Sequence, residues 1–150
     1  NKGLPYSLNR AISIAKGKYI VRVDSDDYIN KNFLNILSTY LDLNPESNAI
    51  ACDYNLVDSF ENFISRENCQ ESHIGCGIMF KKETLFEIGL YDEELLINEE
   101  VDLRIRYQKK YNIERLAIPL YRYRQHEKNM TKDNINKIKY DKKLFRKHGK

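Results

Sequence analysis

A short apolar run followed at once by three aspartates constrains this chain more than any other feature. Residues 18–23, KYIVRV, have the apolar content of a buried strand. The next stretch, VDSDDYIN, carries Asp24, Asp26 and Asp27. Carboxylates this close repel one another and cost stability unless a positive charge lies against them. The chain must therefore place the end of a buried strand beside something positive.

The rest of the sequence alternates between helical and strand patterns. Apolar residues at helical spacing predict helices over residues 4–15, 33–41, 81–89 and from about 133 to 147. Other apolar runs predict strands over residues 18–23, 48–58, 62–66, 73–80 and 113–124. Residues 98–111 alternate like a strand, but Asn98 followed by two glutamates favours a helix. This alternation predicts one α/β layered domain over residues 1–150.

Composition narrows the class of protein. A hydrophobic fraction of 41% is enough to build a core, and a net charge of +3 is too slight to indicate nucleic-acid binding. Three cysteines without CxxC spacing favour neither a disulfide framework nor a zinc site, which indicates a reducing compartment. No apolar run reaches the roughly 18 residues of a membrane span. We expect a cytoplasmic protein, with contact at the inner face of the membrane left open by its basic C-terminal stretch.

The acidic cluster has two interpretations. Side chains at positions i and i+2 of a strand point to the same face, so Asp24 and Asp26 are expected to converge. Ligands of open α/β sheets bind at this carboxyl end, and paired carboxylates suit Mg²⁺ or Mn²⁺. The alternative is a turn or a helix cap, with Asp27 capping a helix that begins near Asn30.

Four ordered motifs favour the metal interpretation. The first comprises Asn1, Gly3, Asn9, Ala15, Gly17, Tyr19, Ile20 and the DSDD of residues 24–27. The others are GCGIMFKKETLFEIGLYDEEL (75–95), NEEVDLRIR (98–106) and YRYRQHEKNMT (121–131). Together they resemble the family 2 glycosyltransferases of the GT-A fold, over nearly the whole chain. The resemblance implies a Rossmann-like mixed sheet flanked by helices.

The resemblance also implies an activity and a donor site. The family transfers a sugar from a nucleoside-diphosphate donor to an acceptor hydroxyl, with inversion, in glycan or cell-surface polysaccharide synthesis. By position, Asp24 would hold the donor ribose or a metal-bound water, and Asp26 would ligate Mn²⁺ or Mg²⁺ directly. His126 is a further candidate metal ligand, and Asn9 and Arg124 are candidate donor-binding residues.

The acceptor side is expected around the later motifs. The family takes its catalytic base from the second residue of a Glu-Asp pair, which falls on Glu100 here, a longer side chain than the usual aspartate. Glu99 and Asp102 remain alternatives, and acidic residues at a helix start are also stabilised by the helix dipole without any catalysis. Gly75 and Gly77 allow close approach and, with Asp102, are candidate acceptor-binding positions.

The family's first strands, which hold the nucleotide, are not recognisable in this sequence. We therefore expect the chain to be the central and C-terminal part of a GT-A catalytic domain, lacking the first strands of the fold and inactive by itself. The expected partners are a nucleotide sugar and a glycan or lipid-linked acceptor, with possible peripheral membrane contact. Two other functions stay open: a metal-dependent nucleotidyltransferase, and an inactive copy that binds an acceptor or a partner.

Overall fold

Helices and strands alternate along the computed structural model, which describes residues 2–125 and 134–149. The helices of this part of the chain are α1 (Leu4–Ile14), α2 (Phe33–Leu43), α3 (Lys82–Glu87), α4 (Glu99–Gln108) and α5 (Asn134–His148). The strands are β1 (Tyr19–Val21), β2 (Tyr28–Ile29), β3 (Ala49–Val57), β4 (Phe63–Glu67), β5 (Ile78–Lys81) and β6 (Glu114–Arg124). The predicted α/β class is confirmed.

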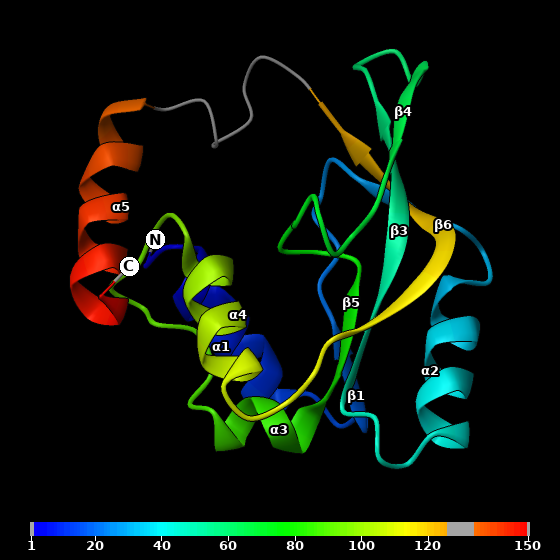
Figure 1. Cartoon of the computed structure of the whole chain (residues 1–150), viewed down its shortest axis with the longest axis horizontal. Coiled ribbons are helices and arrows are strands. Elements are labelled where there is room, and N and C mark those ends of the chain that lie inside the picture. Colours follow the sequence, from blue (N-terminus) through cyan, green and yellow to red (C-terminus); the bar gives the residue numbers. More distant parts are fainter. Residues whose placement is uncertain (1, 126–133, 150) are drawn as a thin grey trace.

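The strands form one mixed sheet in the order β1-β5-β3-β6-β2, and β4 pairs with β3 beside this path. Among the described residues, β3 and β6 pair in parallel and the other strand pairs are antiparallel. Figure 1 shows α2 on one side of the sheet and the remaining helices on the other. This is the mixed sheet flanked by helices that the sequence predicts.

The alternation of β3 divides the core between the two faces of the sheet. Ala49 and Ala51 face the cluster that contains Ile12, Phe80 and Tyr107. Residues of β3 two apart point to the same face, so the intervening side chains point away from this cluster. The opposite cluster comprises Ile50, Cys52, Tyr54, Cys76, Met79, Leu120 and Tyr121 with three residues of α2, namely Phe33, Leu37 and Leu41. The four-residue spacing of those helix positions explains why α2 buries one stripe.

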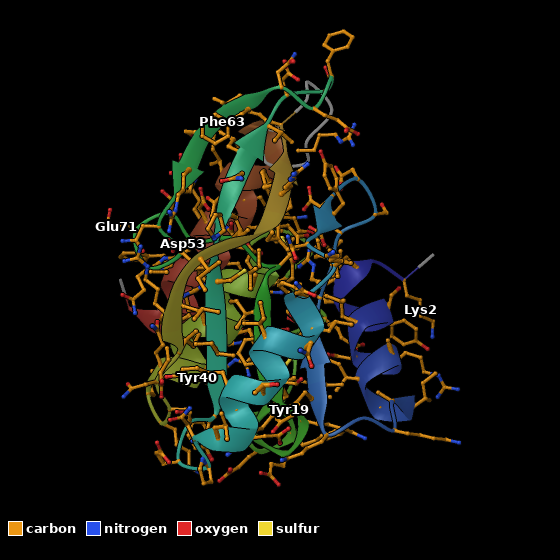
Figure 2. All side chains as sticks on the ribbon, turned by 90° about the vertical axis from the view of Figure 1, so that its right-hand side faces the viewer. Lys2, Tyr19, Tyr40, Asp53, Phe63 and Glu71 are labelled. Atoms are coloured by element: carbon orange, nitrogen blue, oxygen red, sulfur yellow. The ribbon has the colours of Figure 1, made fainter. Side chains whose placement is uncertain are left out.

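A buried aspartate fixes the bend of the two central strands. The register between β3 and β6 shifts on both sides of Asp53, which pairs with Pro119. Asp53 is 1% exposed and lies on β3 beside the curved β6 (Figure 2). Arg115 of β6 donates to both of its oxygens at 2.8 Å, and Arg66 of β4 donates to one at 3.0 Å. One carboxylate therefore joins three strands where the sheet curves.

Three parts of the sheet differ from the predicted pattern. The first strand ends at Val21, whereas the apolar pattern runs to residue 23. The two-residue strand β2 was not predicted, because it is too short for a periodic pattern. Strand β5 begins at Ile78, and the glycine-containing residues before it form a loop. The helix prediction for residues 98–111 is confirmed by α4, although Asn98 caps it without a side-chain hydrogen bond.

None of the helices in the described ranges, 2–125 and 134–149, is long and apolar enough to cross a membrane.

The Asp53 junction generates a stability prediction. Asp53→Asn keeps the shape but removes the charge that two arginines share, so the free energy of unfolding should fall by about 3 kcal/mol. Urea denaturation followed by circular dichroism measures it. Asp42→Asn is the matched control, because Asp42 forms an exposed pair with Lys18 and its loss should change stability little. Equal stability of the Asp53→Asn variant and the wild type would contradict the assigned role.

Candidate active site

The acidic cluster forms a turn instead of continuing the strand. The backbone N–H of Asp27 donates to the carbonyl of Asp24 at 3.1 Å, which closes the turn of residues 24–27. We call these residues the acidic turn. Because β1 ends at Val21, the strand alternation expected to bring Asp24 and Asp26 together does not apply. Asp26 is exposed, whereas Asp24 and Asp27 are half-buried.

Strand β6 holds the acidic turn in place through Asp27. The hydroxyl of Tyr121 donates to Asp27 Oδ2 at 2.7 Å, and the backbone N–H of Arg124 donates to Asp27 Oδ1 at 2.8 Å. Tyr121 also accepts a hydrogen bond from the backbone N–H of Asp24 at 3.2 Å. Asp27 thus anchors the turn to the sheet and does not cap α2, which begins at Phe33. Burial nevertheless raises the pKa of Asp27, while the bonds from Arg124 and Tyr121 oppose that rise.

Arg22 supplies the positive charge beside the turn. Its Nε donates to Asp24 Oδ1 at 2.6 Å and its Nη2 to Oδ2 at 3.1 Å, in a two-pronged pair. Its Nη1 donates to Glu99 Oε1 at 3.0 Å. The pKa of Arg22 rises despite burial, because the bond to Asp24 and the charges of Asp24 and Glu99 favour its charged form. Arg22 therefore links the acidic turn to the first residue of α4.

The two glutamates at the start of α4 differ in environment. Glu99 is 5% exposed and paired with Arg22, whereas Glu100 is half-buried. Burial and the neighbouring charge of Glu100 raise the pKa of Glu99 to about 7, and Arg22 opposes that rise. A methyl group at Gly75 would lie 3.0 Å from both Arg22 Nη1 and Glu100 Cβ. Gly75 thus provides the clearance that lets the helix start approach Arg22.

Gly77 is constrained by its backbone conformation. Its φ of +73° lies in the left-handed region, whereas an added methyl group would make only ordinary van der Waals contact, 3.5 Å from the ring of Tyr121. At Gly75, the close approach is made by the protein's own side chains of Arg22 and Glu100. The acceptor-binding role of both glycines remains a prediction.

Two further candidate residues, Asn9 and Arg124, make well-defined contacts with the protein's own groups. Asn9 joins α1 to the backbone of Tyr91. The Nδ2 of Asn9 donates to the carbonyl of Tyr91, and the Oδ1 of Asn9 accepts from the backbone N–H of Tyr91, both at 2.9 Å. The guanidinium of Arg124 donates to the carbonyl of Asp26 at 2.9 Å and to Glu61 at 3.1 Å. Both residues support neighbouring backbone, and their donor-binding roles remain predictions. His126 lies outside the described residues.

Asp102 is buried under the C-terminal helix. It is 0% exposed, and its carboxylate pairs with Arg106 at 2.7 Å and with Lys147 and His148 of α5 at 2.8 Å each. Although burial alone would raise it, the bonds from Arg106, Lys147 and His148 lower the pKa of Asp102. In this arrangement an acceptor has no access to the carboxylate. The acceptor role stays a prediction that requires α5 to withdraw.

The acidic turn has a donor set suited to a hard cation. Ligand atoms of Asp24, Asp27 and Cys76 lie within 4.8 Å of one another. The Cys76 thiol is buried, and burial together with the charge of Asp24 raises its pKa, so it remains a protonated, weak donor toward Asp27 at 3.6 Å. Hard cations such as Mg²⁺ and Mn²⁺ prefer carboxylate oxygens. The carboxylates of Asp24 and Asp27 therefore fit such an ion, whereas Asp26 is not part of this group and the protonated cysteine does not add to the fit.

Sequence reasoning missed two residues of this site. Arg22 carried a signal, since a charged residue interrupts the apolar run YIVRV beside three aspartates. Tyr121 opens the motif of residues 121–131, but nothing in that motif marks this tyrosine as part of the site.

The family model described as Glycosyl transferase family 2 matches residues 1–145 of the chain. A comparison with curated proteins gave no match.

Solved structures share the fold at low sequence identity. TarS of S. aureus (residues 1–349, in complex with UDP) is 21% identical with a TM-score of 0.65, over 83% of this chain and 40% of that one. The mannosyltransferase PcManGT from Pyrobaculum calidifontis, in complex with GDP-Man and Mn²⁺, is 14% identical with a TM-score of 0.65. That match covers 98% of this chain and 44% of the mannosyltransferase. The chain thus has a GT-A-like fold and spans about two fifths of the length of these neighbours.

The environment of Glu99 predicts a pH dependence of stability. Its folded-state pKa of about 7 lies above the ordinary 4.5, so the folded protein binds more protons than the unfolded one between these values. Its contribution to the free energy of unfolding therefore falls as pH rises from about 4.5 to about 7. In Glu99→Gln this slope should be shallower, as measured by urea denaturation across the window.

The matched control for this slope is Glu83→Gln, which changes an exposed glutamate in the first turn of α3. That variant should retain the wild-type slope. A slope unchanged in Glu99→Gln would show that Glu99 is already ionised throughout the window.

Proposed function

The chain belongs to glycosyl transferase family 2, and we propose that it forms part of the catalytic domain of an inverting glycosyltransferase. This enzyme moves a sugar from a nucleoside-diphosphate donor to an acceptor hydroxyl, in the synthesis of a glycan or a cell-surface polysaccharide. One observation carries the proposal: Arg22 joins the acidic turn directly to the acidic start of α4. The two motifs required for donor activation and for proton removal are therefore neighbours.

The donor is proposed to bind at the acidic turn. Asp24, Asp26 and Asp27 would hold Mn²⁺ or Mg²⁺, and Asp26 is the member whose side chain is exposed to an incoming ion. When bound, such an ion screens the diphosphate and stabilises it as a leaving group. The neighbours crystallised with UDP, or with GDP-Man and Mn²⁺, support a UDP- or GDP-linked donor.

The base is proposed to be Glu100. Inversion by a single displacement needs one carboxylate that takes the proton from the attacking hydroxyl. Glu99 is buried and engaged by Arg22, which leaves Glu100 as the more accessible carboxylate of the pair. Glu100 also faces Gly75, the position predicted to lie on the acceptor side. The acceptor, a glycan or lipid-linked hydroxyl, and any contact with a membrane surface remain part of the proposal.

We also propose that the chain is the central and C-terminal part of its catalytic domain, since it spans only two fifths of its structural neighbours. Activity should therefore be assayed in the complete catalytic domain. Incubation with Mn²⁺ and a panel of UDP- and GDP-linked sugars should release the nucleoside diphosphate. Release of pyrophosphate from nucleoside triphosphates would instead indicate a nucleotidyltransferase, and neither product would indicate an inactive binding protein.

The role of Asp26 gives a first functional prediction. Asp26→Ala should abolish metal-dependent turnover, because the exposed carboxylate of the acidic turn is lost. Turnover at a series of Mn²⁺ concentrations measures this. Asp58→Ala is the matched control, since Asp58 is an aspartate of another turn, between β3 and β4, where it accepts bonds from Phe60 and Asn62. Normal Mn²⁺ dependence in Asp26→Ala would contradict the metal site.

The role of Glu100 gives a second functional prediction. Glu100→Gln keeps the size of the side chain but removes its basicity, so turnover should fall by roughly 10²–10⁴-fold while donor affinity persists. Steady-state kinetics and calorimetry with the nucleotide sugar separate the two effects. Turnover close to wild type, or the same loss confined to Glu99→Gln, would move the base to another residue.

A further inference from the structure

Arg22 forms an ion pair with Asp24, a carboxylate at which a divalent cation is proposed to bind. Its guanidinium contacts both oxygens of Asp24, at 2.6 and 3.1 Å. The side chain of Arg22 is 15% exposed and that of Asp24 is 28% exposed. A shielded, two-pronged pair is stronger than a surface ion pair, so it persists in solution.

A divalent cation at Asp24 would lie close to this guanidinium. Like charges within about 4–6 Å disfavour one another, and the shielding of the pair strengthens that effect. Arg22 is held there by its second bond, to Glu99, whose side chain is 6% exposed. Glu99 therefore anchors the positive charge and at the same time neutralises part of it.

We propose that Arg22 is an internal counter-cation of the acidic turn, shared between Asp24 and Glu99, that competes with the divalent cation and lowers its affinity. The inference rests on the proposed donor site and adds a form of regulation to it. Without metal, the turn stays folded because Arg22 neutralises it. A divalent cation binds tightly only when further negative charge, such as that of a diphosphate, offsets the repulsion.

A purely structural role for Arg22 makes the opposite prediction. If the pair served only to orient Asp24, its removal would loosen the carboxylate and weaken cation binding. The direction of the change in affinity therefore distinguishes competition from support. This readout does not depend on sugar transfer.

The experiment measures Mn²⁺ binding to the full chain by electron paramagnetic resonance of the free ion. At a pH above the raised pKa of Glu99, Arg22→Gln/Glu99→Gln removes one positive and one negative charge, so the net charge is unchanged and Glu99 is not left as a buried charge without Arg22. We expect its Mn²⁺ affinity to rise about tenfold. Glu99→Gln alone removes only the charge that offsets Arg22, and its affinity should fall about threefold.

Two further variants serve as controls. Lys18→Gln/Asp42→Asn deletes an exposed ion pair, again without changing net charge, and should bind Mn²⁺ like the wild type. Arg22→Lys keeps the charge but cannot contact both oxygens of Asp24 in the same way, so its affinity should lie between the wild type and the double variant. Near-ultraviolet circular dichroism checks folding. If the double variant does not fold, Glu99→Gln and Arg22→Lys still test the direction.

Each possible outcome of these measurements either supports or overturns the inference. Unchanged or weaker binding in the double variant overturns it, as does tighter binding in Glu99→Gln. Absence of Mn²⁺ binding to the wild-type chain also overturns it, and sugar transfer by the complete catalytic domain would then leave the proposed glycosyl transfer intact. The expected order of affinities in the chain, together with no sugar transfer by the complete catalytic domain, would support the inference and reject the proposed function.

Discussion

The parallel pairing of β3 with β6 is the interaction on which the rest of the molecule depends. These strands are the longest in the described part of the chain, and both faces of the core are built on β3. Beyond the bend at Asp53, β6 also pairs with β2 and directs Tyr121 and Arg124 toward the acidic turn. The position of the turn is therefore set by long-range strand pairing and not by the local sequence around it.

Charge balance is the second constraint, and it ties the site together. The acidic turn and the start of α4 bring carboxylates close enough to repel one another, and Arg22 lies between Asp24 and Glu99. Such a bridge requires the helix start to approach the strand closely, which Gly75 allows because it lacks a side chain. The same arrangement that neutralises the site also brings its two motifs into contact.

The sequence predicted the class of fold, the main helices and most strands, because long periodic segments report which face is buried. It did not predict β2, which has only two residues, nor the turn that replaces the last part of the first predicted strand. The clustering of the aspartates predicted the carboxylates of the candidate site, and their role remains a prediction. Sequence reasoning missed the contact of Arg22 with Glu99 and those of Tyr121 with the acidic turn, because these partners lie 77 to 97 residues away along the chain.

The acidic residues at the start of α4 show why a motif alone does not assign a role. The helix dipole favours all of them equally, since they lie in the same first turn. They differ in how much positive charge lies against each carboxylate. Asp102 is surrounded by three basic side chains, and its pKa is lowered although burial opposes this. Glu99 has one shared guanidinium, and burial raises its pKa to about 7. Asp102 consequently fastens α4 to α5, whereas Glu99 is only partly neutralised, by a guanidinium that it shares with Asp24.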